Sequence, residues 1–228
     1  KFSKVVSDGQ IFQSNWSLEE TQNKYPTLDN KCVIHNAVDK DIFFKKNVFE
    51  KSSKKIKLIA NSWSDNFDKG FDIYKYLDDH LDFKKYSMTF IGNTPIKFKN
   101  IKIVKPLNSI ELADQIRLHD VFIFASKIEA CSNTLIEALS CGVPSIVRNT
   151  SSNSEILNKS GELFNNVGEL IPKIDQVTSE LNKYRNLINC KDLEVIGAEY
   201  LKFFRNTKDS INNLSSHRKM NLINYLNI

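Results

Sequence analysis

From residue 55 to residue 165, short apolar runs alternate with longer stretches of helical periodicity, and this alternation constrains the fold more than any other feature. Strands that alternate with helices of about 10–15 residues form parallel sheets with crossover helices on both faces. The run Val121–Phe124 is continuously apolar, which is typical of a strand buried on both sides. We therefore predict an α/β fold with a Rossmann-like parallel sheet, whose strands are Ile56–Ala60, Tyr86–Ile91, Ile101–Val104, Asp120–Ala125, Pro144–Val147 and Gly161–Phe164.

The spacing of apolar residues between these runs predicts the helices. They are expected at Ser17–Lys24, Lys69–Leu81, Ser109–Leu118, Asn133–Cys141, Val167–Phe204 with a break near 186–191, and Asp209–Leu226. Asp78 and Asp79 fall inside a helix and are expected at the surface, so they do not form a metal site beside a strand end. Residues 45–55 are polar and are expected to form a linker.

Composition excludes several classes of function. The net charge of +5 is modest, and the basic residues form no stripe with interleaved aromatic residues, so nucleic acid is not an expected partner. No apolar stretch approaches the ~18 residues of a membrane-spanning helix. The four cysteines lack metal-ligand or disulfide spacing, which favours reduced thiols in a cytosol-like compartment. The chain begins with lysine, so we expect a fragment of a longer protein or an engineered chain.

The segment from Glu129 to Glu137 carries the chemistry. Ser132-Asn133-Thr134 is expected to begin a helix, whose first N–H groups lack internal partners and bear the positive end of the helix dipole. A diphosphate is stabilised at such an end. Glu137, about one turn inside the helix, can accept hydrogen bonds from vicinal ribose hydroxyls, and Glu129 precedes the helix within reach of an attached sugar. Taken singly, Asn133 and Thr134 are more often simple helix caps, and Glu137 is more often a solvated residue of a helix surface.

This segment resembles the donor-binding segment of retaining glycosyltransferases of family 4, which are GT-B enzymes that use nucleotide sugars. The resemblance extends over roughly residues 32–165. Val33–Asp39 is similar to the Ile-Pro-Asn-Gly-Val-Asp that opens the C-terminal domain of the family, and Lys69-Gly70 is similar to its Lys-Gly. Lys105-Pro106-Leu107 occupies the place where the backbone meets the nucleotide base.

The resemblance implies a role for each matching residue. Glu129 would be catalytic, next to the reacting carbon of the transferred sugar, and Glu137 would hold the ribose hydroxyls. Lys69 would contact the diphosphate. The remaining donor-binding residues would be Pro106 and Leu107 at the base, and Ser132, Asn133, Thr134 and Leu135 at the phosphates. It implies transfer of a hexose from a donor such as a UDP- or GDP-sugar, with retention and without a metal or further cofactor.

Three departures from the family pattern bear on function. Ser64 stands where the family usually has an arginine, and His35 and Ala37 replace its proline and glycine, which is expected to change only loop geometry. Only about thirty residues precede the C-terminal domain. We therefore divide the chain into 1–31, the end of an N-terminal acceptor-binding domain, and 32–228, a nucleotide-sugar-binding domain with C-terminal helices.

The leading hypothesis is the donor half of a glycosyltransferase of glycan biosynthesis, which would reach a glycan or lipid-linked acceptor through the missing domain. We expect a cytoplasmic location, with the membrane surface as a further option. A non-catalytic domain that keeps the fold as an interaction module is one alternative. Another GT-B enzyme, such as a sugar-nucleotide epimerase, is a second alternative, which the Lys-Gly and two-glutamate pattern disfavours.

Overall fold

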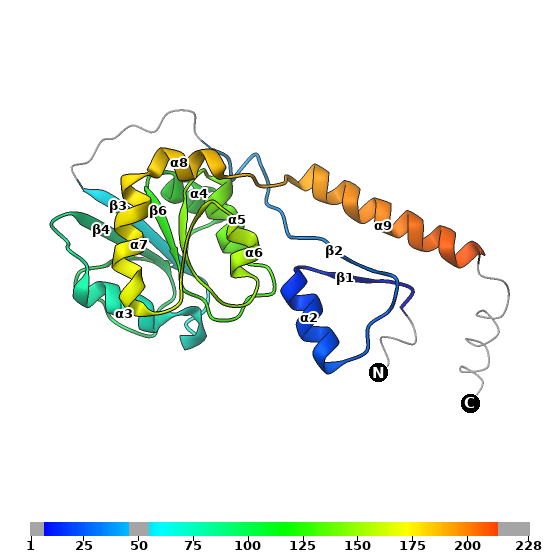
Figure 1. Cartoon of the computed structure of the whole chain (residues 1–228). Coiled ribbons are helices and arrows are strands. Elements are labelled where there is room, and N and C mark those ends of the chain that lie inside the picture. The colour runs from blue at the N-terminus through cyan, green and yellow to red at the C-terminus, as the bar shows by residue number, and fades with distance from the viewer. Residues whose placement is uncertain (1–6, 46–54, 214–228) are drawn as a thin grey trace.

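The computed structural model of the chain describes residues 7–45 and 55–213 (Figure 1). Its centre is a six-stranded sheet in which every neighbouring pair is parallel, in the order β5-β4-β3-β6-β7-β8. The strands are β3 (Ile56–Ser62), β4 (Tyr86–Gly92), β5 (Lys102–Val104), β6 (Val121–Phe124), β7 (Ser145–Arg148) and β8 (Gly161–Phe164). The predicted α/β fold with a parallel sheet is confirmed.

The strand order determines where a ligand can bind. The chain enters the sheet at β3, proceeds outward to β5 at one edge, and then crosses back to β6 on the other side of β3. This is the order of a Rossmann sheet, with its topological switch point between β3 and β6. Ligands of such sheets bind in the crevice at the carboxyl ends of the two strands that flank the switch point. The loops after Ser62 and Phe124 therefore form the expected binding rim.

Helices cover both faces of this sheet, as predicted. Helices α3 (Phe71–His80), α7 (Val167–Ser179) and α8 (Leu181–Leu187) cover one face. Helices α4 (Ser109–Arg117), α5 (Asn133–Ser140) and α6 (Asn153–Leu157) cover the other. Neighbouring residues of one strand alternate between the two layers, so that Leu58 of β3 packs with the first group and Ile59 with the second. Both side chains are fully buried.

A smaller unit precedes the main sheet. Strand β1 (Gln10–Phe12) pairs in parallel with β2 (Lys31–Val33), and α2 (Asn15–Lys24) connects them. Helix α9 (Leu193–Asn213) leaves the main sheet and runs beside this unit (Figure 1), where Asn30 donates to the hydroxyl of Thr207 at 3.0 Å. Because β2 pairs with β1, Cys32 and Val33 lie in the small unit, although the sequence division assigned them to the following domain.

One predicted surface residue is instead at the centre of the fold. Asp78 of α3 is completely buried, and its carboxylate accepts hydrogen bonds from the backbone N–H groups of Lys99, Asn100 and Ile101. Burial opposes its ionisation, but these three N–H bonds together with Lys75 hold the pKa of Asp78 below its usual value. The carboxylate thus anchors the loop that leads into β5. The expectation that Asp78 is exposed was wrong, whereas Asp79 pairs with Lys75 nearer the surface.

The other helix boundaries differ in detail. Lys69 lies in a 3-10 turn, η1 (Phe67–Lys69), so the regular helix begins only at Phe71. The C-terminal helices have an additional break at Glu180, and α9 continues through the predicted gap before residue 209. The remainder of that last predicted helix, and most of the predicted linker, lie outside the described residues. None of the helices in the described ranges is long and apolar enough to span a membrane.

Candidate functional site

Two residues that lie sixty positions apart in the sequence meet at the switch point. The ammonium group of Lys69, in the turn after β3, lies 2.8 Å from Oε1 of Glu129, in the loop after β6. Both side chains are only partly exposed, at 35% for Lys69 and 18% for Glu129. A cation and a carboxylate therefore face the space at the carboxyl ends of β3 and β6, where the fold places ligands.

Gly70 is required for this meeting. It has a φ of +88°, a left-handed conformation that other residues adopt only with strain. A Cβ atom at this position would lie 2.3 Å from the carbonyl oxygen of Ala125, which is a severe clash. The turn after β3 thus packs directly on the end of β6. This close packing places the neighbouring Lys69 beside the loop that carries Glu129.

The backbone of Glu129 is held from the next loop along the sheet. Its N–H donates to the hydroxyl of Ser151 at 3.0 Å, and its carbonyl accepts from the hydroxyl of Ser152 at 2.8 Å. Ser151 has a positive φ of 49°, which turns the loop back toward Glu129. The Glu129 side chain is therefore presented on a backbone fixed at both its N–H and its carbonyl.

Helix α5 begins immediately beside this loop. Ser132 is its N-cap and accepts a hydrogen bond from the N–H of Leu135 at 3.3 Å. The Leu135 N–H is therefore already occupied. The N–H groups of Asn133 and Thr134 have no acceptor among the described residues and remain available to an anion. Asn36 braces this start by donating to Oδ1 of Asn133 at 2.8 Å.

Glu137 lies one turn into α5 and is the most perturbed acid of the site. Its Oε2 is buried and has no hydrogen-bond partner among the described residues. Burial raises the pKa of the carboxyl from an ordinary 4.5 to about 7. A buried acceptor without a donor is costly, because its lost hydration is not replaced. The hydroxyl groups of a ligand would supply the missing donors.

Pro106 and Leu107 follow β5 at the same rim. They line a narrow crevice together with Trp63, Gly92 and other residues at the ends of β3 and β4. Leu107 packs against the hydrophobic cluster under α4, whereas Pro106 is exposed. Pro106 and Leu107 thus lie at the rim beside Trp63, whose side chain is 56% exposed and which was not predicted from the sequence.

Ser64 adds no cation to the site. Its hydroxyl accepts the N–H of Asn66, so it is part of the turn that leads to Lys69. Two other cations are nearby. Arg148, the last residue of β7, donates to the carbonyl of Ala125 and pairs with Asp72 at 3.1 Å, and Lys127 lies 3.5 Å from Asp68. The sequence analysis did not assign either residue to the site.

His35 has a larger effect than a change of loop geometry. Its Nε2 lies 2.6 Å from Oε1 of Glu155, at the start of α6, and the same carboxylate accepts the backbone N–H of Asn15. Burial opposes the ionisation of Glu155, but these partners hold its pKa below the usual value. His35 and Glu155 thus connect the small N-terminal unit to the main domain. The expectation that His35 alters only the loop was wrong.

Within the described ranges, no group of three or more histidine, cysteine, aspartate or glutamate side chains is arranged to hold a metal ion. All four cysteines are free thiols. Each of the four has its pKa raised, in every case chiefly by burial, so the chain offers no activated thiolate. The chemistry of the rim therefore depends on carboxylates, cations and backbone N–H groups.

Comparison with known proteins identifies the fold. Residues 75–180, just under half of the chain, match the family described as Glycosyl transferases group 1. A glycosyltransferase from Rickettsia africae superposes with a TM-score of 0.73 at 18% identity, over 90% of this chain and 66% of that protein. The fold is that of a GT-B glycosyltransferase C-terminal domain.

Two further structures share this GT-B fold. HepE from Anabaena, solved with UDP and glucose, has a TM-score of 0.72 at 13% identity and covers 89% of this chain and 64% of its own. A TarM variant from S. aureus was solved with fondaparinux, α-GlcNAc-glycerol and UDP. It has a TM-score of 0.70 at 17% identity, and the match covers 89% of this chain and 45% of TarM. The present chain thus spans less than two thirds of each protein. No curated protein matches its sequence.

Proposed function

We propose that this chain is the donor-binding half of a retaining glycosyltransferase of family 4, which moves a hexose from a nucleotide sugar to an acceptor. The observation that carries the proposal is the convergence of Lys69, Glu129 and the start of α5 at the switch point. A cation and unpaired N–H groups suit a diphosphate, and an adjacent carboxylate suits the sugar attached to it. The match of residues 75–180 to group 1 glycosyl transferases supports the same function.

Each residue has a distinct task in this proposal. Glu137 accepts the ribose hydroxyls, which supply donors to its unpartnered oxygen. Lys69 and the N–H groups of Asn133 and Thr134 receive the diphosphate. When the bond from the sugar carbon to the phosphate oxygen breaks, its electron pair leaves with the diphosphate, and these groups stabilise that charge. Glu129 contacts the sugar at the reacting carbon, and the base lies along Pro106 and Leu107.

The acceptor, a glycan or a lipid-linked glycan, requires a second wall of the cleft. GT-B catalysis takes place between two domains, which must close to position the acceptor against the donor. The small β1–β2 unit lies beside the donor domain, and His35 and Glu155 join the two. We therefore expect this chain to bind donor and to transfer sugar poorly by itself. The proposed location is cytoplasmic.

Calorimetric titration with UDP-glucose, UDP and GDP tests donor binding. Glu137→Ala removes the acceptor of the ribose hydroxyls, at a cost of about 1.5–3 kcal/mol for charge-assisted hydrogen bonds. We expect the dissociation constant to increase roughly tenfold to a hundredfold. Glu19→Ala, which removes an exposed carboxylate of α2, is the matched control and should bind as the unmodified chain does. Absence of binding by every nucleotide at millimolar concentration would contradict the proposal.

A second function is favoured by one observation. Ser64 is used in a local turn and leaves the site one cation short of the family pattern that it resembles. A domain that binds nucleotide sugars without transferring them would tolerate this loss. The two functions are separated by a transfer assay on a longer protein, in which an N-terminal acceptor-binding domain is joined to this chain. Transfer with retained anomeric configuration supports the enzyme, provided that Glu129→Ala reduces turnover more than donor affinity. Donor binding without transfer supports the binding domain.

A further inference from the structure

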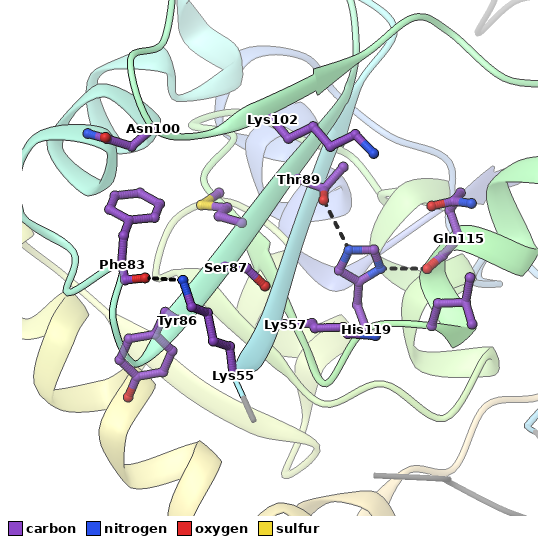
Figure 2. A pocket seen from close by; sticks show the side chains of 12 residues that line it. Lys55, Lys57, Phe83, Tyr86, Ser87, Thr89, Asn100, Lys102, Gln115 and His119 are labelled. Carbon is purple, nitrogen blue, oxygen red and sulfur yellow. Dashed lines mark hydrogen bonds between the residues drawn. The ribbon is translucent and has the colours of Figure 1, made fainter. Parts of the chain in front are cut away.

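A spacious cavity lies at the opposite end of the sheet from the proposed donor site. It opens at the amino ends of β3 and β4 and beside β5, and its volume is about 490 Å³ (Figure 2). Strand β3 has seven residues, so its two ends are separated by about 20 Å at ~3.3 Å per residue. This pocket is therefore a separate site from the rim that holds Lys69 and Glu129. Its size is within the range of small-molecule sites, roughly 300–1,000 Å³.

The floor of this pocket is polar, whereas strands of a parallel sheet covered by helices on both faces are normally apolar. Paired residues of neighbouring parallel strands share a face, and the register pairs Lys57 with Ser87 and Thr89 with Lys102. This face of the sheet is therefore polar at the amino ends, where strands covered by helices are normally apolar. Helix α4 covers only the other half, where Ile59 and other apolar residues meet it. Among the described residues, the amino-terminal half of the face is left open between α4 and the sheet edge.

The pocket carries positive charge without a carboxylate in its lining. Lys55, Lys57 and Lys102 line it, and the ammonium groups of Lys57 and Lys102 form no ion pair with any described residue. Lys55 donates to the carbonyl oxygen of Phe83 at 2.7 Å, which holds its side chain at the edge of this pocket. Asp120, which precedes β6, does not line the pocket, and its Oδ2 is occupied by the backbone N–H of Lys57 at 2.9 Å. Lys57 and Lys102 thus face a space whose described lining contains no carboxylate.

His119 provides a fixed polar group at one wall. Its Nδ1 lies 2.7 Å from the carbonyl oxygen of Gln115, and its Nε2 lies 3.2 Å from the hydroxyl of Thr89 (Figure 2). Burial lowers the pKa of His119, and Lys57 and Lys102 lower it further, although the Gln115 carbonyl and Asp120 act in the opposite direction. The ring is therefore neutral at pH 7. A carbonyl can only accept, so Nδ1 carries the proton and Nε2 accepts from Thr89.

The remaining walls are partly apolar. Phe83, Tyr86 and Leu118 line the pocket, and Figure 2 shows the rings of Phe83 and Tyr86 beside Lys55. We propose that this pocket is a second ligand site, which binds a soluble phosphate monoester with a small ring attached. The phosphate lies among Lys57, Lys102 and the hydroxyl of Ser87, and the ring lies toward Phe83. Two lysines match the charge of a monoester, and the aromatic wall matches its ring.

The test uses phenyl phosphate as the probe and the imidazole resonances of His119 as the reporter. His119 is one of four histidines, and the spectrum of His119→Gln identifies its signals. We expect phenyl phosphate to shift these signals saturably, with a dissociation constant on the order of 1 mM or tighter. Phenol, which has the ring without the charge, should produce no saturable shift of these signals. Because the reporter lies in this pocket, the result does not depend on whether the distant rim binds nucleotide sugars.

The lysines are tested with Lys57→Gln/Lys102→Gln, which shortens each side chain by one atom, keeps it polar and removes two charges. We expect at least a tenfold weaker dissociation constant, with an unchanged circular dichroism spectrum. Lys202→Gln/Lys208→Gln removes two exposed charges from α9 and is the matched control. Unchanged affinity in the first variant, or equal loss in both, would overturn the proposal. The proposal would also be overturned if phenyl phosphate produced no saturable shift while the chain bound phosphatidylglycerol vesicles and Lys57→Gln/Lys102→Gln abolished that binding.

Discussion

The pKa of Glu137 makes donor binding depend on pH in a way that can be calculated. In the free chain, burial raises this pKa to about 7. Ribose hydroxyls donate hydrogen bonds to the carboxylate, so bound donor favours the ionised form and returns the pKa toward its ordinary 4.5. Protonation of the free chain then competes with binding. Affinity is therefore highest above pH 7 and decreases as the pH falls below it.

The size of the effect follows from the two pKa values. At pH 6, one unit below the free pKa, about ten of every eleven free chains are protonated at Glu137, whereas at pH 8 about one in eleven is. The dissociation constant should thus be about tenfold weaker at pH 6 than at pH 8. Calorimetry with UDP-glucose measures this change. UDP is less suitable, because a terminal phosphate titrates near pH 6 by itself.

Glu137→Gln is the matched variant, because glutamine keeps the shape and cannot titrate. It should bind UDP-glucose more weakly at pH 8 and show no tenfold change between pH 8 and pH 6. An equal dissociation constant at the two pH values in the unmodified chain would refute the reasoning, because Glu137 would then not bind the donor as a carboxylate. A pH dependence that persists in Glu137→Gln would assign it to another group.

Further predictions concern affinity and stability. Because the pKa of Glu137 is raised in the folded chain, its ionisation lowers the free energy of unfolding as pH rises from 4.5 to about 7. In urea unfolding at pH 8, Glu137→Gln should therefore be more stable than the unmodified chain by up to about 3 kcal/mol. At pH 4.5 the two should differ little. Lys69→Ala should weaken UDP-glucose about tenfold or more in calorimetry and leave uridine unaffected. Asp78→Ala orphans three backbone N–H groups and should cost about 3–5 kcal/mol in urea unfolding. Gly70→Ala should cost about 2 kcal/mol or more, whereas Gly197→Ala, which has open space in α9, should be neutral or stabilising.

The sheet could be predicted from the sequence because its strands are short and almost wholly apolar. Val121–Phe124 is buried at every position, which no amphipathic helix would be. Helix α5 was also placed within one residue, because Ser132 caps it and Gly142, at a φ of +78°, follows it. Local signals of this kind act within a few residues and are readable in a single sequence.

The features that were missed depend on partners far away along the chain. Asp78 is buried because its acceptors are filled by backbone N–H groups more than twenty positions later, which carry no side-chain signature. The pairing of Lys69 with Glu129 spans sixty residues and was expected only to the extent that the family resemblance placed both at the donor. The pocket at the amino ends did have a signal, since Ser87 and Thr89 alternate with apolar residues in β4, which is the pattern of a half-exposed strand.

The most direct test of the central claim is a crystal structure of this chain with UDP. The account predicts the ribose hydroxyls at Glu137, and the diphosphate at the N–H groups of Asn133 and Thr134 beside Lys69. The base should lie against Pro106 and Leu107, at the carboxyl ends of the strands. UDP bound only in the pocket at the amino ends of β3 and β4, or a ribose remote from Glu137, would contradict the assignment of the donor site.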